Sequence, residues 1–221
     1  MIHYHGTPIT PKHELDKMAG RSFCVSYARR DNAKWCLQNG QSIMWDNGAF
    51  SFYTRKTTVD WDGFYSWVEP LLAGAHWAVV PDVIEGDIEQ NLELIRQWPH
   101  RKDLACVVWH MDEPLGHLLK LRDMGFGKIA FGSSGKYWKV GNSDWCRRAD
   151  EAFNTLTMTG PLPWVHMLRG LRLAGERWPF ASLDSTNVGR NFKTRNECPD
   201  SMARRIDAIQ SPIHWTLKGT K

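Results

Sequence analysis

Short apolar runs alternate along the chain with longer stretches in which hydrophobic residues recur at helical spacing. Several runs are almost continuously apolar, as in AVV and ACVVW, which is typical of parallel strands buried on both faces. The pattern predicts strands at Ile2–His5, Ser22–Tyr27, Ser42–Trp45, Trp77–Val80, Leu104–Trp109, Lys128–Phe131, Trp164–Met167 and Phe180–Leu183.

The stretches between these strands predict helices. In one of them Trp61, Phe64, Tyr65 and Val68 recur at helical spacing, and Gly74 follows as a stop. Capping residues and glycines mark other helix ends in the same way. The predicted helices are Pro11–Ala19, Asp31–Gln38, Val59–Leu72, Ile88–Trp98, Pro114–Met124, Ser143–Met158, Arg169–Glu176 and Pro199–Ile209.

Strands that are each followed by a helix indicate a closed parallel (β/α)8 barrel of the TIM type. A doubly wound open sheet with helices on both faces is the alternative. No Pro/Ser-rich linker or low-complexity tract divides the sequence, so we expect residues 1–221 to form a single domain.

Composition narrows the classes of function only a little. Hydrophobic residues make up 42% of the chain and charged residues 24%, as in an ordinary soluble protein, and the formal net charge is +4. This mildly basic balance permits nucleic acid as a partner without requiring it. No apolar run approaches the ~20 residues that span a bilayer, and no signal-peptide pattern is present, so we expect no membrane association and a cytoplasmic location.

The cysteines are scattered along the chain, and no two lie within four residues of each other. Zinc sites of the knuckle type need closely spaced pairs, so we expect no zinc. An odd, scattered set is typical of reduced thiols in a cytoplasm. The residues are Cys24, Cys36, Cys106, Cys146 and Cys198.

Polar residues follow the predicted strands directly, and the loops after the strands carry the chemistry in a barrel of this kind. Asp46, Asp82 and Asp184 follow three different strands. We expect them to converge at the opening of the barrel at the carboxyl ends of its strands, which we call the mouth. A lone aspartate there often caps the next helix, but three together raise one another's pKa, which usually marks chemistry. Two carboxylates suit glycosyl transfer, one attacking C1′ and the other moving protons, while the third could accept hydrogen bonds from guanine.

Three further polar features could serve this mouth. The GSSG turn at residues 132–135 could cradle a phosphate or offer amides to a base, although glycine turns are common after strands. His110 could donate a hydrogen bond or be only a polar residue at a strand end. His3 and His5 alternate along the first strand and share a face; a metal pair there is conceivable, but it lacks partner ligands.

Basic and aromatic residues interleave in the loops assigned to the mouth. A basic rim around an acidic centre suits a phosphodiester strand that feeds one nucleotide into a pocket, and aromatic rings could stack bases. The simpler interpretation is that loops are polar. The cations are Arg29, Arg30, Arg55, Lys56, Lys136, Lys139, Arg169, Arg190, Lys193 and Arg195, and the aromatic residues are Phe50, Phe52, Tyr53, Tyr137 and Trp138.

Five segments, in order, resemble the tRNA-guanine transglycosylase superfamily. SIMWDNGAFSFY (42–53) resembles the family's IMTDSGGFQ, and VVPDVIEGD (79–87) stands where a strand of the family ends in its guanine-recognising aspartate. DEPLGHLLKLRDMGFGKIAFGSSG (112–135) resembles the family's helix, strand and GGL turn. VHMLRG (165–170) resembles its YLMG strand, and ASLDSTNVGRN (181–191) resembles FDCVLPTRNGRNG, in which the aspartate is the nucleophile.

The resemblance implies a role for each aspartate. Asp184 would be the covalent nucleophile, Asp46 would bind the base and act as general acid/base, and Asp82 would read the Watson–Crick edge of guanine. Asn47 and Phe50, in the same segment as Asp46, would be further contacts to the base.

The resemblance also implies backbone contacts and a basic rim. Gly132, Ser133 and Ser134 would offer backbone groups to the base, as the family's Gly-Leu turn does. The family's glutamine after strand five is replaced here by Trp109 or His110, so this contact departs from the family. Of the rim cations, those expected to contact nucleic acid are Arg55, Lys56, Lys136, Arg190 and Lys193.

The chain also departs from the family at its end. The family's CxCxxC zinc motif is absent, and only 30 residues follow Asn191. The sequence therefore looks more like the phage and bacterial relatives that place 7-deazaguanines in DNA. This implies DNA and a free base such as 7-cyano-7-deazaguanine (preQ0) as partners, with no metal or cofactor. The alternatives are the same reaction on tRNA, an inactive nucleic-acid-binding barrel, and a hydrolytic glycosidase acting on nucleosides.

Overall fold

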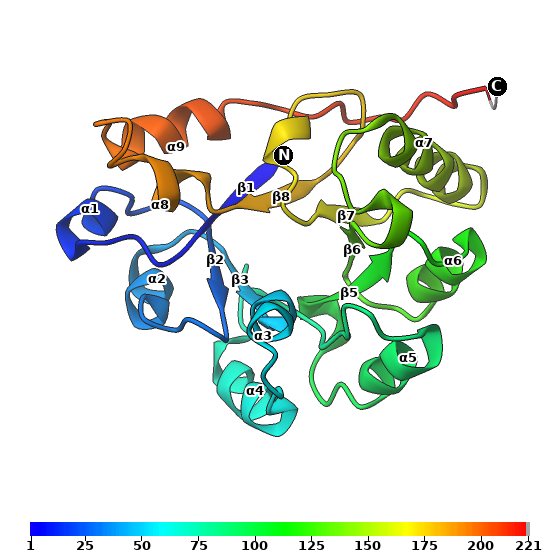
Figure 1. Cartoon of the computed structure of the whole chain (residues 1–221), viewed down its shortest axis with the longest axis horizontal. Coiled ribbons are helices and arrows are strands. Elements are labelled where there is room, and N and C mark those ends of the chain that lie inside the picture. Colours follow the sequence, from blue (N-terminus) through cyan, green and yellow to red (C-terminus); the bar gives the residue numbers. More distant parts are fainter. Residues whose placement is uncertain (220–221) are drawn as a thin grey trace.

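The computed structural model describes residues 1–219 and arranges parallel strands in a closed barrel (Figure 1). Each strand pairs with its neighbour in sequence, and β8 pairs with β1 to close the ring. The (β/α)8 fold predicted from the apolar runs is therefore confirmed, and the open-sheet alternative is wrong. The strands are β1 (Ile2–Gly6), β2 (Phe23–Ser26), β3 (Ile43–Asp46), β4 (Trp77–Val79), β5 (Ala105–His110), β6 (Lys128–Gly132), β7 (Trp164–Met167) and β8 (Ser182–Ser185).

Helices surround the strands as an outer ring, while α3 lies nearer to the barrel centre than α4 (Figure 1). Capping side chains fix where several helices begin. Asp60, Asp87 and Asn142 each accept a backbone N–H in the first turn of the helix that follows. The α-helices are α1 (Lys12–Asp16), α2 (Ala33–Asn39), α3 (Ala49–Arg55), α4 (Trp61–Val68), α5 (Ile88–Arg96), α6 (Leu115–Asp123), α7 (Ser143–Met158), α8 (Asn187–Asn191) and α9 (Pro199–Asp207). The short 3₁₀ turns are η1 (Glu69–Leu71), η2 (Lys102–Leu104), η3 (Gly135–Tyr137) and η4 (Leu171–Leu173).

The bounds of β7 and α7 were predicted correctly, whereas one strand and one helix predicted near the end of the chain differ from the structure. The strand expected at Phe180–Leu183 is β8, Ser182–Ser185, because the Phe180 ring packs on Phe131 and Phe153 outside the barrel before the strand begins. Asp184 therefore lies within the strand rather than in the loop after it.

The helix expected at Arg169–Glu176 was also wrong. Only the turn η4 forms there, because Gly170 and Gly175 interrupt the segment and Gly175 has a φ of +79°. Conversely, α3 and α8 form in segments that were interpreted as loops, and each has only one buried residue to signal a helical face: Ala49 in α3 and Val188 in α8.

Two layers of apolar side chains lie on either side of the strands. The outer layer packs between the strands and the helices, and in it the Phe131 ring contacts Trp109, Phe153 and Phe180 with ring centroids 5.1–5.7 Å apart. The inner layer fills the barrel with side chains from alternate strand positions. It comprises Tyr4, Met44, Trp77, Val79, Cys106, Val108 and Ala130.

Near the carboxyl end of the barrel, the strand positions that face inward are polar instead of apolar. Register partners in a parallel sheet lie side by side on the same face, and Tyr4 is the partner of Asp184. Asp46 lies two residues beyond Met44 and is the partner of Ser26. Asp46 and Asp184 therefore face the barrel axis near the carboxyl ends of their strands, next to the inner apolar layer.

Truncation of Phe131 should test the outer layer. Phe131→Ala removes a fully buried ring that three other aromatic rings contact, so we expect the free energy of unfolding to fall by about 3–5 kcal/mol. Met158→Ala, at a side chain that is 73% exposed, is the control and should change it by less than about 0.5 kcal/mol. Urea denaturation measures both, and a loss below about 1 kcal/mol for Phe131→Ala would contradict this packing.

Candidate active site

Asp184 is held at the carboxyl end of β8 by two donors that share one of its oxygens. Nε2 of His166 lies 3.3 Å from Oδ1, and the backbone N–H of Arg169 donates to the same oxygen at 2.8 Å. Burial acts to raise the pKa of Asp184, but these two contacts outweigh it and the pKa is below its usual value. Asp184 is therefore ionised at neutral pH, and its Oδ2 has no hydrogen-bond partner among residues 1–219.

Asp46, at the end of β3, lies in an environment that raises its pKa, whereas that of Asp184 is lowered. Burial raises the pKa of Asp46 to about 6, and the negative charges of Asp184 and Asp82 act in the same direction. Hydrogen bonds from Ser26 and from the Gly48 amide, 3.1 Å from Oδ2, oppose this only in part. The two inner carboxylates thus have pKa values shifted apart, one down and one up.

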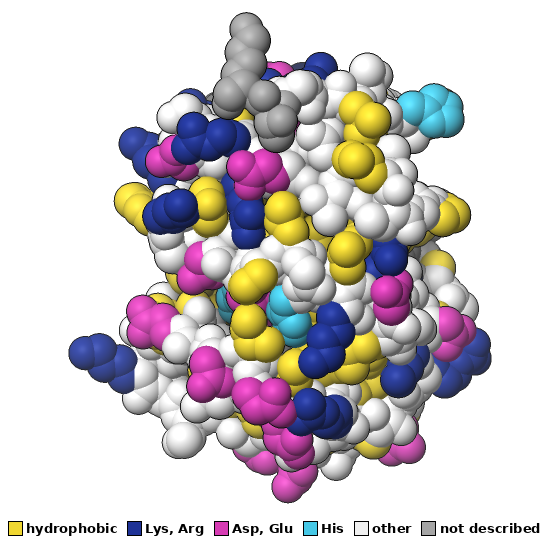
Figure 2. Space-filling view, turned by 90° about the vertical axis from the view of Figure 1, so that its right-hand side faces the viewer, with side chains coloured by type: hydrophobic (Ala, Val, Ile, Leu, Met, Phe, Trp, Pro, Cys, Tyr) yellow, Lys and Arg dark blue, Asp and Glu magenta, His cyan; other side chains and the backbone are white. Residues whose placement is uncertain are grey.

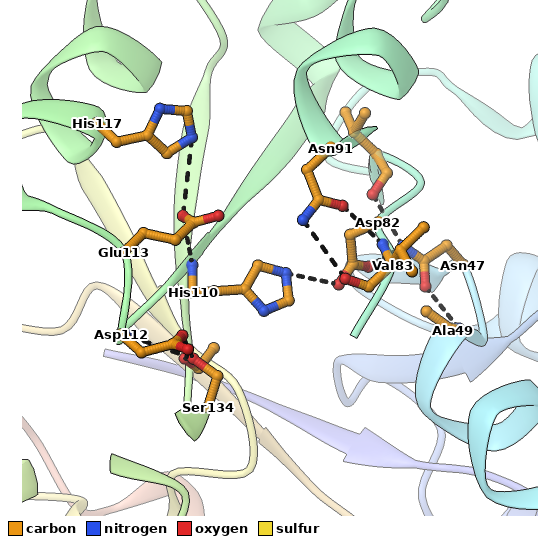
Figure 3. A network of polar contacts seen from close by, with 12 residues as sticks. Asn47, Ala49, Asp82, Val83, Asn91, His110, Asp112, Glu113, His117 and Ser134 are labelled. Carbon is orange, nitrogen blue, oxygen red and sulfur yellow. Dashed lines mark hydrogen bonds and ion pairs between the residues drawn. The ribbon is translucent and has the colours of Figure 1, made fainter. Parts of the chain in front are cut away.

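Asp82 follows β4 and is bound on both sides (Figure 3). The Asn47 amide donates to Oδ1 at 2.8 Å and to the carbonyl of Val80 at 2.8 Å, while Oδ1 of Asn47 accepts the Ala49 amide. Nε2 of His110 lies 3.2 Å from Oδ2 of Asp82 without lining up as a hydrogen bond, so this contact is an ion pair when the His110 ring is protonated. Asn47 has used its hydrogen-bonding groups within the protein, and it positions Asp82.

His110 and Glu113 extend this network toward α6 (Figure 3). Burial acts to lower the pKa of His110, but the adjacent Asp82 outweighs it and the pKa is raised. Burial raises the pKa of Glu113 to about 7; its Oε2 accepts the His110 amide at 3.1 Å and lies 3.7 Å from Nε2 of His117. His110 is therefore a partner of Asp82, which favours the charged form of its ring, and not only a polar residue at a strand end.

The turn after β6 offers backbone rather than side-chain groups. The Ser133 hydroxyl accepts the indole N–H of Trp145 at 2.9 Å and is turned toward α7, and the Ser134 hydroxyl donates to the carboxylate of Asp112. Gly132 is buried, and its carbonyl accepts the Met111 amide. A Cβ at Gly132 would lie 3.0 Å from Val108, so the strand end has little room for a larger residue.

Phe50 of α3 and Arg169 of the loop after β7 meet over the mouth. The Arg169 guanidinium lies 4.4 Å from the centroid of the Phe50 ring, and the Arg169 amide binds Asp184 with a φ of +59° at that residue. The loop therefore connects α3 to the nucleophile candidate. Phe50 remains 47% exposed.

The predicted nucleic-acid contacts do not all lie together. Arg55 and Lys56 are exposed at the end of α3, Lys136 is exposed in η3 and Arg190 is exposed in α8, each directly after a strand's carboxyl end. Lys193 instead lines an outer cavity of about 450 Å³ beside α1, together with Pro11, Glu14 and Lys17. Lys193 therefore lies beside α1, and its contact with nucleic acid stays a prediction. A second cavity, of about 620 Å³, lies between α4 and α5, and neither Asp46, Asp82 nor Asp184 lines it.

His3 and His5 do share a face of β1, but it is the outer face. Their ring centroids are 4.6 Å apart; Nε2 of His3 lies 3.0 Å from the Ser185 hydroxyl, and Nε2 of His5 lies 3.0 Å from Asp207. Burial lowers the pKa of His3 to about 3, so this ring is neutral at neutral pH and adds no charge near Asp184. In residues 1–219 no group of three or more His, Cys, Asp or Glu side chains is arranged to hold a metal ion.

No family model, curated protein or solved structure matches this chain. Within the described part of the chain no helix has the length and apolarity needed to cross a bilayer. The interpretation of the site therefore depends on its own geometry and on the resemblance of the sequence motifs.

Sequence reasoning missed two groups that contact Asp184. His166 was quoted only as part of the VHMLRG segment, and Arg169 was counted as a rim cation although its backbone amide is what binds Asp184. The signal for His166 was its spacing: it lies two residues after Trp164 in β7, so both face the barrel interior, where β7 has His166 beside Ser182 of β8.

Replacement of Asp46 by asparagine should reveal its raised pKa. The folded protein binds this proton more tightly than the unfolded chain does, so the stability that Asp46 contributes is full below pH 4 and is lost as the pH rises through about 6. We expect Asp46→Asn to gain about 2 kcal/mol of unfolding free energy relative to wild type between pH 4.5 and 7. Asp103→Asn, at an exposed carboxylate, is the control, and a difference for Asp46→Asn that does not vary with pH would be inconsistent with this pKa.

Proposed function

We propose that the protein is a base-exchanging glycosyltransferase that replaces guanine in DNA with a 7-deazaguanine through a covalent glycosyl–Asp184 intermediate. The observation that carries this proposal is the pair of inner carboxylates, Asp184 and Asp46, whose pKa values are shifted in opposite directions. Such a pair supplies a nucleophile and a proton carrier at neutral pH.

In the first half of the reaction the old base leaves. Oδ2 of Asp184, which has no partner within residues 1–219, forms a bond to C1′ of the deoxyribose while the bond from C1′ to N9 of guanine breaks. Asp46, protonated in an appreciable fraction near neutral pH, gives its proton to the departing base, so guanine leaves as a neutral molecule.

In the second half the new base enters. The incoming 7-deazaguanine loses its N9 proton to the Asp46 carboxylate, N9 forms a bond to C1′, and the bond from C1′ to Oδ2 breaks. Asp184 is ionised again and Asp46 is protonated again, so the cycle uses no metal, cofactor or additional reactant.

The base specificity in this proposal comes from the resemblance and from the Asp82 network. Asp82 is held between Asn47 and His110, and each of its oxygens has a further lone pair that can accept from the N1–H and exocyclic amine of guanine. The amides of the 132–135 turn and the exposed ring of Phe50 are the remaining contacts that we assign to the base.

A polymer substrate is supported by the exposed cations at the mouth. Arg55, Lys56, Lys136 and Arg190 make no ion pair with any residue from 1 to 219, so they are free to meet phosphates. By contrast, the face formed by α5, α6 and α7 carries cations and carboxylates side by side (Figure 2). We assign DNA rather than tRNA because the sequence motifs look more like those of the relatives that act on DNA; tRNA is the second candidate.

Incubation with labelled guanine and either duplex DNA, single-stranded DNA or tRNA should test the reaction. We expect label to enter DNA, and to enter the single strand at least as fast as the duplex, because extruding a paired base costs a few kcal/mol. Asp184→Asn should abolish exchange and leave no trapped covalent adduct, since an amide cannot form the glycosyl ester, whereas Asp103→Asn should retain activity.

Each outcome of this experiment has a definite meaning. Label only in tRNA would replace DNA by tRNA as the substrate. Release of guanine from any nucleic acid without incorporation would indicate a hydrolase. No exchange or release, with binding retained, would indicate an inactive barrel, and activity of Asp184→Asn within tenfold of wild type would exclude Asp184 as the nucleophile.

The salt dependence of DNA binding should test the cationic mouth. If Arg55 and Lys56 both contact phosphates, replacing both with alanine should reduce the slope of log K against log salt by about one to two units. Arg101→Ala with Lys102→Ala is the matched control, because this adjacent Arg-Lys pair is exposed at the amino end of β5. Equal slopes for the two double variants would mean that DNA does not approach over α3.

A further inference from the structure

We infer that His166 is the positioning residue for the Asp184 nucleophile: it holds Oδ1 so that Oδ2 is left to attack C1′. This inference rests on the proposed function for its catalytic meaning, but the geometry behind it can be tested without activity. The two donors to Asp184, Nε2 of His166 and the amide of Arg169, both contact Oδ1. A carboxylate held on one oxygen presents the other in a fixed direction.

His166 is in turn held by a second pair of contacts. Its Nδ1 lies 2.8 Å from the Ser182 hydroxyl, and the same hydroxyl accepts the indole N–H of Trp164 at 2.8 Å. The ring is completely buried and packs edge-on against Tyr4 and Trp77, with centroids 6.1 and 5.3 Å away. It therefore cannot turn its Nε2 away from Asp184 without disrupting the inner apolar layer.

This network also selects the position of the proton. An indole N–H can only donate, so Ser182 uses one acceptor site for Trp164; its second acceptor site and its own hydrogen let it pair with Nδ1 of His166 in either state of that nitrogen. A tautomer protonated only on Nδ1 would place a bare Nε2 3.3 Å from an ionised carboxylate, so the carboxylate selects the position of the proton. The arrangement thus requires a proton on Nε2, which donates to Asp184.

A donor at this place acts on both halves of the exchange. Before attack it keeps the buried carboxylate ionised. When the incoming base displaces the enzyme from C1′, the same N–H stabilises the carboxylate as it leaves. The other ionisable or hydrogen-bonding groups that act on Asp184 are the Arg169 amide, His3 from β1, Asp46 from β3 and Cys24 from β2. At neutral pH none of these groups supplies a positive charge, because His3 is neutral and Cys24 is a buried thiol.

The test compares His166→Phe, which removes the donor, with His166→Gln, which keeps an N–H near the position of Nε2. The midpoint of the ¹³C carboxyl titration of Asp184, assigned with Asp184→Asn, should rise by at least one pH unit in His166→Phe and by less in His166→Gln. One unit means about a tenfold loss of the ionised form at pH values below the midpoint, and the acidic limb of adduct formation should move with it. His100→Phe is the matched control, because His100 also packs on aromatic rings but lies near the amino end of β5.

Wild-type protein provides a further measurement that needs no variant to fold. ¹⁵N spectra of histidine-labelled protein should show Nε2 of His166 protonated at pH 7. A bare Nε2 with a protonated Nδ1, or an Asp184 midpoint that is the same in wild type and His166→Phe, would overturn the inference. Absence of exchange on every nucleic acid would instead count against the proposed function, while the NMR results would still decide how His166 is arranged.

Discussion

The central constraint on this molecule is that the interior of an eight-stranded barrel has room for side chains and almost none for water. Every inward polar group must therefore find its partner among the other inward positions, because a buried donor or acceptor without one costs free energy. Tyr4 meets this demand with Trp77 and Ser42. Ser182, His166 and Asp184 meet it in a single chain of contacts.

The same constraint gives each of the three aspartates a different set of partners. Asp82 has a partner on each oxygen, so it is a rigid acceptor fixed in place. Asp184 has partners on one oxygen only, and it remains ionised with the other oxygen free to react. Asp46 has the weakest support, and burial beside two negative charges raises its pKa to about 6. In the proposed reaction, three identical side chains would thus serve as an acceptor, a nucleophile and a proton carrier because their neighbours differ.

Sequence reasoning identified the barrel because buried parallel strands have a compositional signature that does not depend on distant contacts. It also placed Asp46 and Asp82 correctly at strand ends. It could not find the His166 contact, because spacing shows that His166 faces inward but not that the register of β7 and β8 sets it beside Ser182 and near Asp184. The helix α3 was missed for a related reason: its sequence, AFSFYTR, has no clear helical face, and its position depends on contacts such as Phe50 with Arg169 and Tyr53 with Glu85.

In the proposed reaction, chemistry and recognition would occupy different parts of the chain. Asp46, Asp184 and His166 lie in strands, whose register fixes distances within the barrel. The exposed cations and Phe50 lie in α3, η3 and α8, short elements that lie just after strand ends and make few contacts of their own. Arg169 connects the two parts, since its amide binds the nucleophile while its guanidinium covers Phe50. A nucleotide that stacks on the face of Phe50 covered by Arg169 would displace that guanidinium, so binding of the base there and adjustment of the Asp184 loop would occur as one event.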